Sequence, residues 1–339
     1  MDFRKTKNPI DIVIPWVDDA DPAWRAERDR FAQAGFGEED ARFRDWGTFR
    51  YVFRGIERFA PWVRTVHFVT FGHIPDWLDT SHPKLNVVRH GDFIPAEYLP
   101  TFNINAIELN LHRIPGLADR FVYFNDDTFL VGPTEPGDFF KRGLPCGAAV
   151  LCPRRTTPVA KFYIPMANAA AVSEHFSPRR SIARHPGKWL NPKYGPELLS
   201  TLLMLPYPAF YGFREYHLPN AFLKSSFAEV WAAEPEMLRA TCANRFRQPI
   251  DVNQWLVENW QFASGRFAPR SPRFGKNFDL EKDPEKTLAE LAGYVRDGKG
   301  KVVCVGDSAA IDDVASLAAS VRDVLDGVLP ERSSFEREG

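Results

Sequence analysis

Five short apolar runs rich in β-branched and aromatic residues interrupt an otherwise mixed pattern of hydrophobic and polar positions. They lie at 10–14, 65–70, 85–88, 121–124 and 302–305. Runs of this length and composition are typical of buried strands. A helical pattern lies between the first two runs, and the order strand, helix, strand indicates parallel pairing. The sequence therefore predicts an α/β fold, Rossmann-like, with a mainly parallel sheet.

The clearest helical pattern follows the first strand. Its apolar positions recur as on one face of a helix: Phe49, Val52, Phe53, Ile56 and Phe59. Asp45 is the expected N-cap, and Pro61 ends the pattern. Further helices are predicted at 23–34, 103–114, 222–240, 250–263, 280–295 and 312–327. The tail from residue 331 onward is expected to be frayed.

A change in residue composition near residue 150 suggests how the chain is organised. Prolines and aromatic residues crowd the segment up to about residue 275. We expect an α/β core at 1–150, a mainly helical insertion or second lobe at 151–275, and a return to the core at 276–339. A chain of 339 residues is long enough for two modest units of this kind.

Composition excludes several classes of protein. Lys+Arg 43 against Asp+Glu 44 gives a net charge of −1, which argues against a nucleic-acid partner. The four cysteines show no C-x-x-C spacing, which argues against a zinc site and for a reducing compartment. No apolar run approaches the roughly 20 residues that span a bilayer, and the N-terminus lacks a signal-peptide core. A cytoplasmic protein is expected, with peripheral membrane association left open.

Acidic residues follow three of the predicted strands. Asp18, Asp19 and Asp21 follow the first, Asn125-Asp126-Asp127 follows 121–124, and Asp307 follows 302–305. Ligands of open α/β sheets bind at the carboxyl ends of the strands. Adjacent carboxylates repel each other, and Mg²⁺ is commonly held by one or two carboxylates together with phosphate oxygens. These strand ends indicate a cation with a phosphorylated ligand; polar turns and a helix N-cap are the alternative.

Paired basic residues are candidates for binding phosphate. Arg50 and Arg54 lie one turn apart on a predicted helix, where the alternative is a solvated face with an Arg54–Glu57 pair. Arg245 and Arg247 precede another predicted helix, which suits a diphosphate but is also ordinary for a surface.

Two histidines and a glutamate complete the candidates. His217 lies beside a proline and is either structural or a general base, because an imidazole pKa near neutrality suits proton removal. Glu108 and His112 are four positions apart, where a surface pair is the usual explanation. A P-loop and a G-x-S-x-G elbow are both missing from the sequence, which argues against a kinase or an α/β-hydrolase.

The chain resembles the Stealth family of sugar-phosphate transferases in four separated blocks that follow the family's order. The blocks are IDIVIPWVDDADP; the long stretch from RFRDWGTFRYVF to FVYFNDDTFLVG; YHLPNAFL with RFRQPIDVNQW; and VVCVGDS. Phe71 stands where the family usually has Asn or Asp. The resemblance implies a GT-A-like core and transfer of a hexose 1-phosphate from a nucleotide sugar, with UDP favoured over GDP, to an oligo- or polysaccharide hydroxyl.

The resemblance also implies roles for individual residues. The implied catalytic residues are His217, Arg245 and Asp127, and the implied ligands of Mg²⁺ or Mn²⁺ are Asp126 and Asp307. The implied substrate-binding residues are Asp18, Arg50, Arg54, Asn103, Glu108 and Asn125. Asp127 is an alternative metal ligand or base. Two other functions stay open: a metal-dependent glycosyltransferase that releases a nucleoside diphosphate, and a noncatalytic sugar-nucleotide-binding scaffold.

Overall fold

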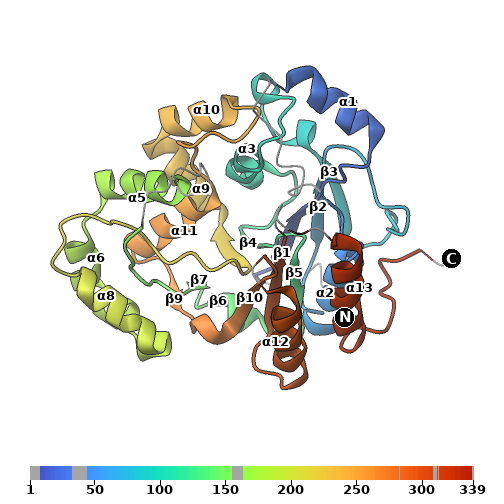
Figure 1. The fold of residues 1–339 in the computed structure, drawn as a ribbon. Coiled ribbons are helices and arrows are strands. Elements are labelled where there is room, and N and C mark those ends of the chain that lie inside the picture. The colour runs from blue at the N-terminus through green and yellow to red at the C-terminus, as the bar shows by residue number, and fades with distance from the viewer. Residues whose placement is uncertain are drawn as a thin grey trace.

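A five-stranded sheet with the order β3-β2-β1-β4-β8 forms the centre of the computed structural model, which describes residues 8–32, 44–154, 163–281, 283–307, 311 and 313–337. Its strands are β1 (Ile10–Pro15), β2 (Val66–Thr70), β3 (Leu85–Arg89), β4 (Arg120–Tyr123) and β8 (Asn220–Leu223). β1 is parallel to β2 and to β4, and β2 is parallel to β3, whereas β8 runs antiparallel to β4 (Figure 1). The mainly parallel sheet confirms the predicted Rossmann-like α/β class.

Two smaller sheets extend the core. One has the order β10-β11-β5, with β10 and β11 parallel and β5 antiparallel to β11. The other has the order β6-β7-β9. Their strands are β5 (Thr128–Leu130), β6 (Phe140–Lys141), β7 (Leu144–Gly147), β9 (Ala268–Pro269), β10 (Gly275–Asp279) and β11 (Val302–Gly306). All five strands predicted from apolar runs are present within two residues of their predicted ends.

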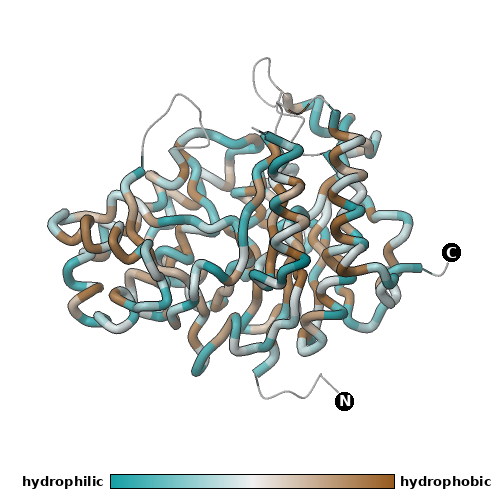
Figure 2. The backbone as a smooth tube through the Cα atoms, turned by 60° about the horizontal axis from the view of Figure 1, so that its bottom comes forward, coloured by the Kyte–Doolittle hydropathy of each residue, from teal (hydrophilic) through white to brown (hydrophobic). Residues whose placement is uncertain are grey.

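Helices surround the sheets. Their bounds are α1 Pro22–Phe31, α2 Phe49–Phe59, α3 Ile104–Asn110, α4 Pro136–Phe139, α5 Ile164–His175, α6 Pro178–Arg184, α7 Pro186–Trp189, α8 Leu198–Met204, α9 Lys224–Ala233, α10 Pro235–Ala243, α11 Gln254–Ala263, α12 Pro284–Arg296 and α13 Val314–Asp326. Hydrophobic and hydrophilic residues alternate along many of the helices (Figure 2), as expected for helices that pack through one face.

The central sheet is buried on both faces. Ile12 and Ile14 of β1 belong to a core shared with α2, α12 and α13, whereas Val13 belongs to a core shared with α3, α5, α9 and α11. This alternation follows from the two-residue period of a strand. Gly55 lets α2 lie directly on β5, because a Cβ there would stand 2.8 Å from the Leu130 carbonyl oxygen.

Two local predictions of helical structure are wrong. The N-cap of α2 is Thr48 and not Asp45, whose side chain accepts instead from the Gly47 amide at 2.8 Å. The segment predicted as one helix at 222–240 begins as strand β8 and continues as two helices, α9 and α10. Pro235 occupies the first position of α10, where its missing N–H removes no helical hydrogen bond.

The C-terminal tail is not frayed through residue 337. Phe335 is buried, and the Glu336 carboxylate accepts two hydrogen bonds from Arg54 at 2.8 and 3.1 Å. A bridge between Leu78 and Glu336 ties the tail to the loop after β2. The buried Arg54–Glu336 ion pair and the packed Phe335 ring offset the conformational entropy lost when the tail becomes ordered.

The predicted insertion at 151–275 contributes to the central sheet as well as to the helical part of the molecule. It supplies β8, the edge strand beside β4. It also supplies most of the helices around the core that contains Val13. The proposed boundaries themselves stay a prediction. Within the described part of the chain, none of the helices has the length and apolar character needed to cross a bilayer.

Candidate active site

Strands of two sheets bring polar side chains together beyond the carboxyl end of β4. β8 runs antiparallel to β4 with Asn220 opposite Tyr123, so the residues just before β8 lie beside those just after β4. β11 runs antiparallel to β5 with Cys304 opposite Thr128, which brings Cys304 next to Asp127. This topology makes neighbours of His217, Cys304 and Asp127.

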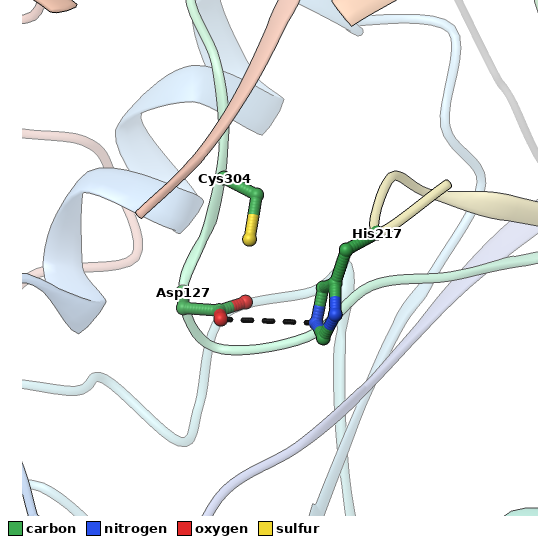
Figure 3. A group of neighbouring side chains, drawn as sticks. All are labelled: Asp127, His217 and Cys304. Carbon is green, nitrogen blue, oxygen red and sulfur yellow. Dashed lines mark ion pairs between the residues drawn. The ribbon is translucent and has the colours of Figure 1, made fainter. Parts of the chain in front are cut away.

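A cluster of Asp127, His217 and Cys304 forms at this edge. A carboxylate oxygen, an imidazole nitrogen and the thiol sulfur lie within 4.8 Å of one another, the sole such trio of His, Cys, Asp or Glu side chains in the described residues (Figure 3). The His217 Nε2 atom lies 3.8 Å from Asp127 Oδ2. The side chains of His217 and Asp127 are 40% and 30% exposed, so a substrate can reach both, whereas Cys304 is buried.

Neighbouring side chains hold the His217 ring in place. The Asn125 side-chain nitrogen lies 2.6 Å from His217 Nε2, and the ring meets Trp255 edge-on with centroids 6.0 Å apart. An amide N–H donated to Nε2 makes that nitrogen the unprotonated one. Asn125 thus holds the ring through the lone pair of Nε2, the nitrogen nearer Asp127.

Asp126 lies in a strongly acidic environment. Burial, then the charge of Asp127, and further the charge of Asp45 raise the pKa of Asp126 to about 7. The pKa of Asp45 is raised in turn by burial and by the charge of Asp18. Carboxylates from three separate segments therefore repel one another here, and a bound cation would relieve that cost.

Asp18 lies at the carboxyl end of β1, as predicted. Its backbone amide donates to His73 Nε2 at 2.9 Å, and one of its carboxylate oxygens accepts from the Ala20 amide. The His73 ring packs edge-on against Trp16. These contacts fix the turn that carries Asp18.

The two predicted metal ligands differ in their surroundings. Asp126 fits a hard divalent cation, because its acidic neighbours favour added positive charge. Asp307 instead accepts from Arg44 through both oxygens, at 3.1 and 3.2 Å. The Asp127–His217–Cys304 trio is a softer donor set, and a thiolate is a poor ligand for Mg²⁺. The residues present fit Mg²⁺ or Mn²⁺ through Asp126 and Asp127, and the role of Asp307 stays a prediction.

The predicted phosphate-binding arginines are held by aromatic rings. The Arg50 guanidinium lies 5.7 Å from the Trp77 centroid, and its charge acts on Asp45. Arg245 lies 4.5 Å from the Phe31 centroid and donates to the Pro100 carbonyl at 3.0 Å. Hydrogen bonds and a ring contact thus hold the Arg245 guanidinium, whereas Arg50 has the ring contact with Trp77.

Two predicted substrate-binding residues, Arg54 and Asn103, make structural contacts. Arg54 is buried against Glu336, so the alternative Arg54–Glu57 pair is wrong. Asn103 caps α3 and donates to Asp251 at 2.8 Å, which ties α3 to the loop that carries Arg245. Their predicted contacts with substrate stay untested.

Glu108 is buried against Tyr123, the last residue of β4. It accepts a hydrogen bond from the Tyr123 hydroxyl at 2.7 Å, and burial raises its pKa to about 7. The expectation of a surface pair with His112 is therefore wrong, because both groups are largely enclosed. A buried carboxyl that supports the last residue of β4 explains the position, and its predicted role in substrate binding stays a prediction.

Two residues near the site were missed by the sequence reasoning. Asp45 was assigned to a helix cap and Cys304 to an apolar strand. An acidic residue just upstream of a helix rich in arginine is a usable signal for Asp45. The place of Cys304 depends on the β11–β5 pairing, which no local pattern reveals.

The fold and the site define an α/β protein with a carboxylate- and histidine-bearing centre at the carboxyl edge of its sheet. The family model "Stealth protein CR1, conserved region 1" matches residues 8–34, and "Stealth protein CR2, conserved region 2" matches residues 42–145. These matches include Asp18, Asp45 and the Asn125–Asp127 turn.

Full-length relatives agree with these matches. A capsular polysaccharide phosphotransferase, WcwK of Streptococcus pneumoniae, is 36% identical over 98% of this chain and 100% of its own length. The receptor polysaccharide phosphotransferase WefC of Streptococcus oralis is 38% identical over 97% of this chain and 99% of its own. The exopolysaccharide phosphotransferase cps2G of Lactiplantibacillus plantarum is 35% identical over 97% and 96%. The chain belongs to the Stealth family.

Solved structures give a weaker likeness. The galactosyltransferase LgtC matches with a TM-score of 0.40 at 11% identity, over 94% of this chain and 96% of its own. The bifunctional glycosyltransferase WbbM matches with a TM-score of 0.40 at 13% identity, over 94% of this chain and 50% of its own. Values this low carry no argument about function.

Proposed function

We propose that this protein transfers a hexose 1-phosphate from a nucleotide diphosphate sugar to a hydroxyl of a glycan acceptor, in the synthesis of a capsular or exopolysaccharide. The acceptor oxygen attacks the phosphorus next to the sugar. The bond from that phosphorus to the bridging oxygen breaks, and a nucleoside monophosphate leaves. The bond between the sugar and its phosphate stays intact, so the anomeric configuration is retained.

The position of His217 beside Asp127 carries the proposal. Once the acceptor hydroxyl replaces the Asn125 N–H at Nε2, that nitrogen accepts the hydroxyl proton as the new P–O bond forms. The resulting imidazolium faces the Asp127 carboxylate, 3.8 Å away, and opposite charges at that distance stabilise each other. Asn125 orients the ring before the reaction. The pair therefore supplies a base together with a group that stabilises its protonated form.

Charge neutralisation is the second requirement. Phosphoryl transfer needs in-line positioning and offset of negative charge more than covalent chemistry. Bound Mg²⁺ or Mn²⁺, held by Asp126 and Asp127, would neutralise diphosphate oxygens, and Asp307 remains a further candidate ligand. Arg245 and Arg50 are assigned to phosphate oxygens as the leaving group gains charge.

The partners follow from this chemistry and from the family. The donor is a nucleotide sugar, with a UDP-sugar favoured over a GDP-sugar, and the acceptor is an oligo- or polysaccharide. All four cysteines, Cys146, Cys152, Cys242 and Cys304, are free and buried. Free thiols agree with the proposed location in the cytoplasm, because disulfides form mainly in oxidising compartments.

One experiment separates the proposal from its alternatives. Purified protein is incubated with a panel of UDP- and GDP-sugars and a surface-glycan extract, with Mg²⁺, Mn²⁺ or EDTA, and the released nucleotide is identified by chromatography. We expect a nucleoside monophosphate that appears only with metal. A nucleoside diphosphate would mean that the glycosidic bond is cut, as in an ordinary glycosyltransferase.

The third outcome is binding without release of any nucleotide. It would support the noncatalytic scaffold and contradict the proposal. A matched variant, His217→Ala, excludes a contaminating activity, because release that persists unchanged in that variant does not come from this site.

A further inference from the structure

The large apolar side chains exposed on the described surface gather in one segment. Six of the seven that are exposed lie between residues 190 and 211, and they are Leu190, Leu199, Leu202, Leu203, Tyr207 and Tyr211. The seventh is Ile250. Leu199 and Leu203 are 60% and 66% exposed, so they contribute little to the core. Apolar side chains clustered in this way mark an interaction surface.

α8 arranges the leucines on one face. Leu199, Leu202 and Leu203 are three and four positions apart, whereas Thr201 and Met204 point into the protein. Figure 1 shows α8 at the edge of the molecule, and hydrophobic turns reach that edge in Figure 2.

Two tyrosines continue this apolar face beyond the end of α8. The Tyr207 amide donates to the Met204 carbonyl, so the chain turns directly after the helix, and the Tyr207 and Tyr211 rings are 5.2 Å apart. The leucine–tyrosine patch is defined here as Leu199, Leu202, Leu203, Tyr207 and Tyr211.

The segment around the patch is strongly basic. Between residues 176 and 214 the sequence has one carboxylate, Glu197, and six basic residues: Arg179, Arg180, Arg184, Lys188, Lys193 and Arg214. The chain as a whole carries a net charge of −1. Arg179 of α6 donates to the Pro206 carbonyl at 2.5 Å, which places the arginines of α6 against the turn that carries Tyr207.

We propose that the leucine–tyrosine patch docks this protein on a bilayer that contains anionic lipid. Leucines that enter the interface, tyrosines at the headgroup level and a basic rim form the combination that binds peripheral proteins to such membranes. A second copy of the chain fits less well, because a symmetric contact would bring two basic rims together. The acidic charge that complements this rim is supplied by the lipid headgroups.

The docking surface is joined to the active site. Glu197, next to the first residue of α8, accepts a hydrogen bond from the Tyr216 hydroxyl and pairs with Arg214 at 3.2 Å. Tyr216 directly precedes His217. A membrane bound by α8 is therefore held at a fixed position relative to His217, which suits an acceptor anchored in that membrane. The docking itself does not depend on the reaction proposed above.

Vesicle flotation of the full chain tests the proposal. The protein is mixed with vesicles of phosphatidylcholine alone or with about one third phosphatidylglycerol, at about 0.1 M salt. We expect flotation only with the anionic vesicles. Leu199→Ser with Leu203→Ser should lower the partition coefficient by at least about tenfold, and Arg180→Glu with Arg184→Glu by about tenfold or more. Salt at about 1 M should weaken the wild-type binding.

Matched controls keep the outcome interpretable. Ile250→Ser removes an exposed apolar side chain outside the patch, and Arg296→Glu reverses an exposed charge on α12; both should float as the wild type does. Flotation unaffected by the leucine variants would overturn the proposal. So would failure of the wild type to float together with a dimer that the same variants abolish, which would assign the patch to self-association. Thermal unfolding of each variant confirms that the fold is retained.

Discussion

His217 Nε2 lies 3.8 Å from Asp127 Oδ2, although the two residues come from segments that are distant in the sequence. The contact exists because β8 pairs antiparallel with β4. It places an ionisable ring against a carboxylate beside the acidic residues that follow β4. A ring in this position can take up a proton and have its new charge stabilised at once.

Replacement of His217 by Ala should lower the rate of nucleotide release about 10²- to 10⁴-fold, because the general base is lost. The measurement is steady-state kinetics with the donor that the panel of nucleotide sugars identifies. His175→Ala is the matched control, since His175 is similarly exposed and pairs with Glu234 at 2.7 Å away from the cluster. Near-normal turnover of the His217 variant would show that another group accepts the proton.

Asp126→Asn should strongly weaken both metal-dependent stabilisation and turnover. The crowded carboxylates around Asp126 disfavour the metal-free state, so we expect Mg²⁺ or Mn²⁺ to raise the melting temperature of the wild type. In the Asn variant this rise should largely disappear, and activity should fall at least about 10²-fold. Thermal unfolding with and without metal is the measurement. Asp307→Asn tests the other predicted ligand, and an undiminished metal response there would exclude it.

Glu336→Gln should destabilise the protein at neutral pH by about 2 kcal/mol, because the buried Arg54 cation keeps only the exposed Asp326 carboxylate, 3.5 Å away, as a counter-charge. Burial acts to raise the pKa of Glu336, but hydrogen bonds from Arg54 and from the Ser333 amide outweigh it, and the pKa is lowered overall. The stabilisation is therefore present above the unfolded-state pKa and is lost as the pH falls through the folded-state value.

Urea unfolding of the Glu336 variant and the wild type should consequently converge below about pH 4. Glu290→Gln is the control, because Glu290 pairs with Lys276 on the surface and its loss should change little. A constant difference between wild type and the Glu336 variant across this pH range would contradict the assignment.

Zn²⁺ should inhibit the enzyme through Cys304. A cysteine sulfur, an imidazole and a carboxylate within 4.8 Å match the ligands of Zn²⁺ better than those of Mg²⁺. Burial and the charge of Asp127 raise the pKa of the Cys304 thiol, so Zn²⁺ would have to displace its proton. We expect Cys304→Ser to raise the Zn²⁺ concentration for half-inhibition by about tenfold or more. The buried Cys146, which is outside the trio, gives the control variant Cys146→Ser. Equal sensitivity of both variants and the wild type would place the inhibitory ion elsewhere.

The sequence by itself determined the strands and the chemistry at their ends. Short runs of β-branched and aromatic residues at the positions of β1, β2, β3, β4 and β11 fill a sheet buried on both faces, so the local pattern already carries the structural information. The acidic residues after β1 and β4 were predictable for the same reason, because ligand sites of parallel sheets lie at the carboxyl ends of the strands.

Only the tertiary structure decided which of these side chains meet. The local spacing of Arg54 and of Glu108 suggests exposed helical pairs, yet both are buried through contacts with distant segments, at Glu336 and at Tyr123. Cys304 gave no signal because its neighbour Asp127 is set by the β11–β5 register. Strand propensity and strand-end chemistry depend on neighbouring residues and can be read locally, whereas pairing between distant strands and the burial of charges depend on the packing of the whole chain.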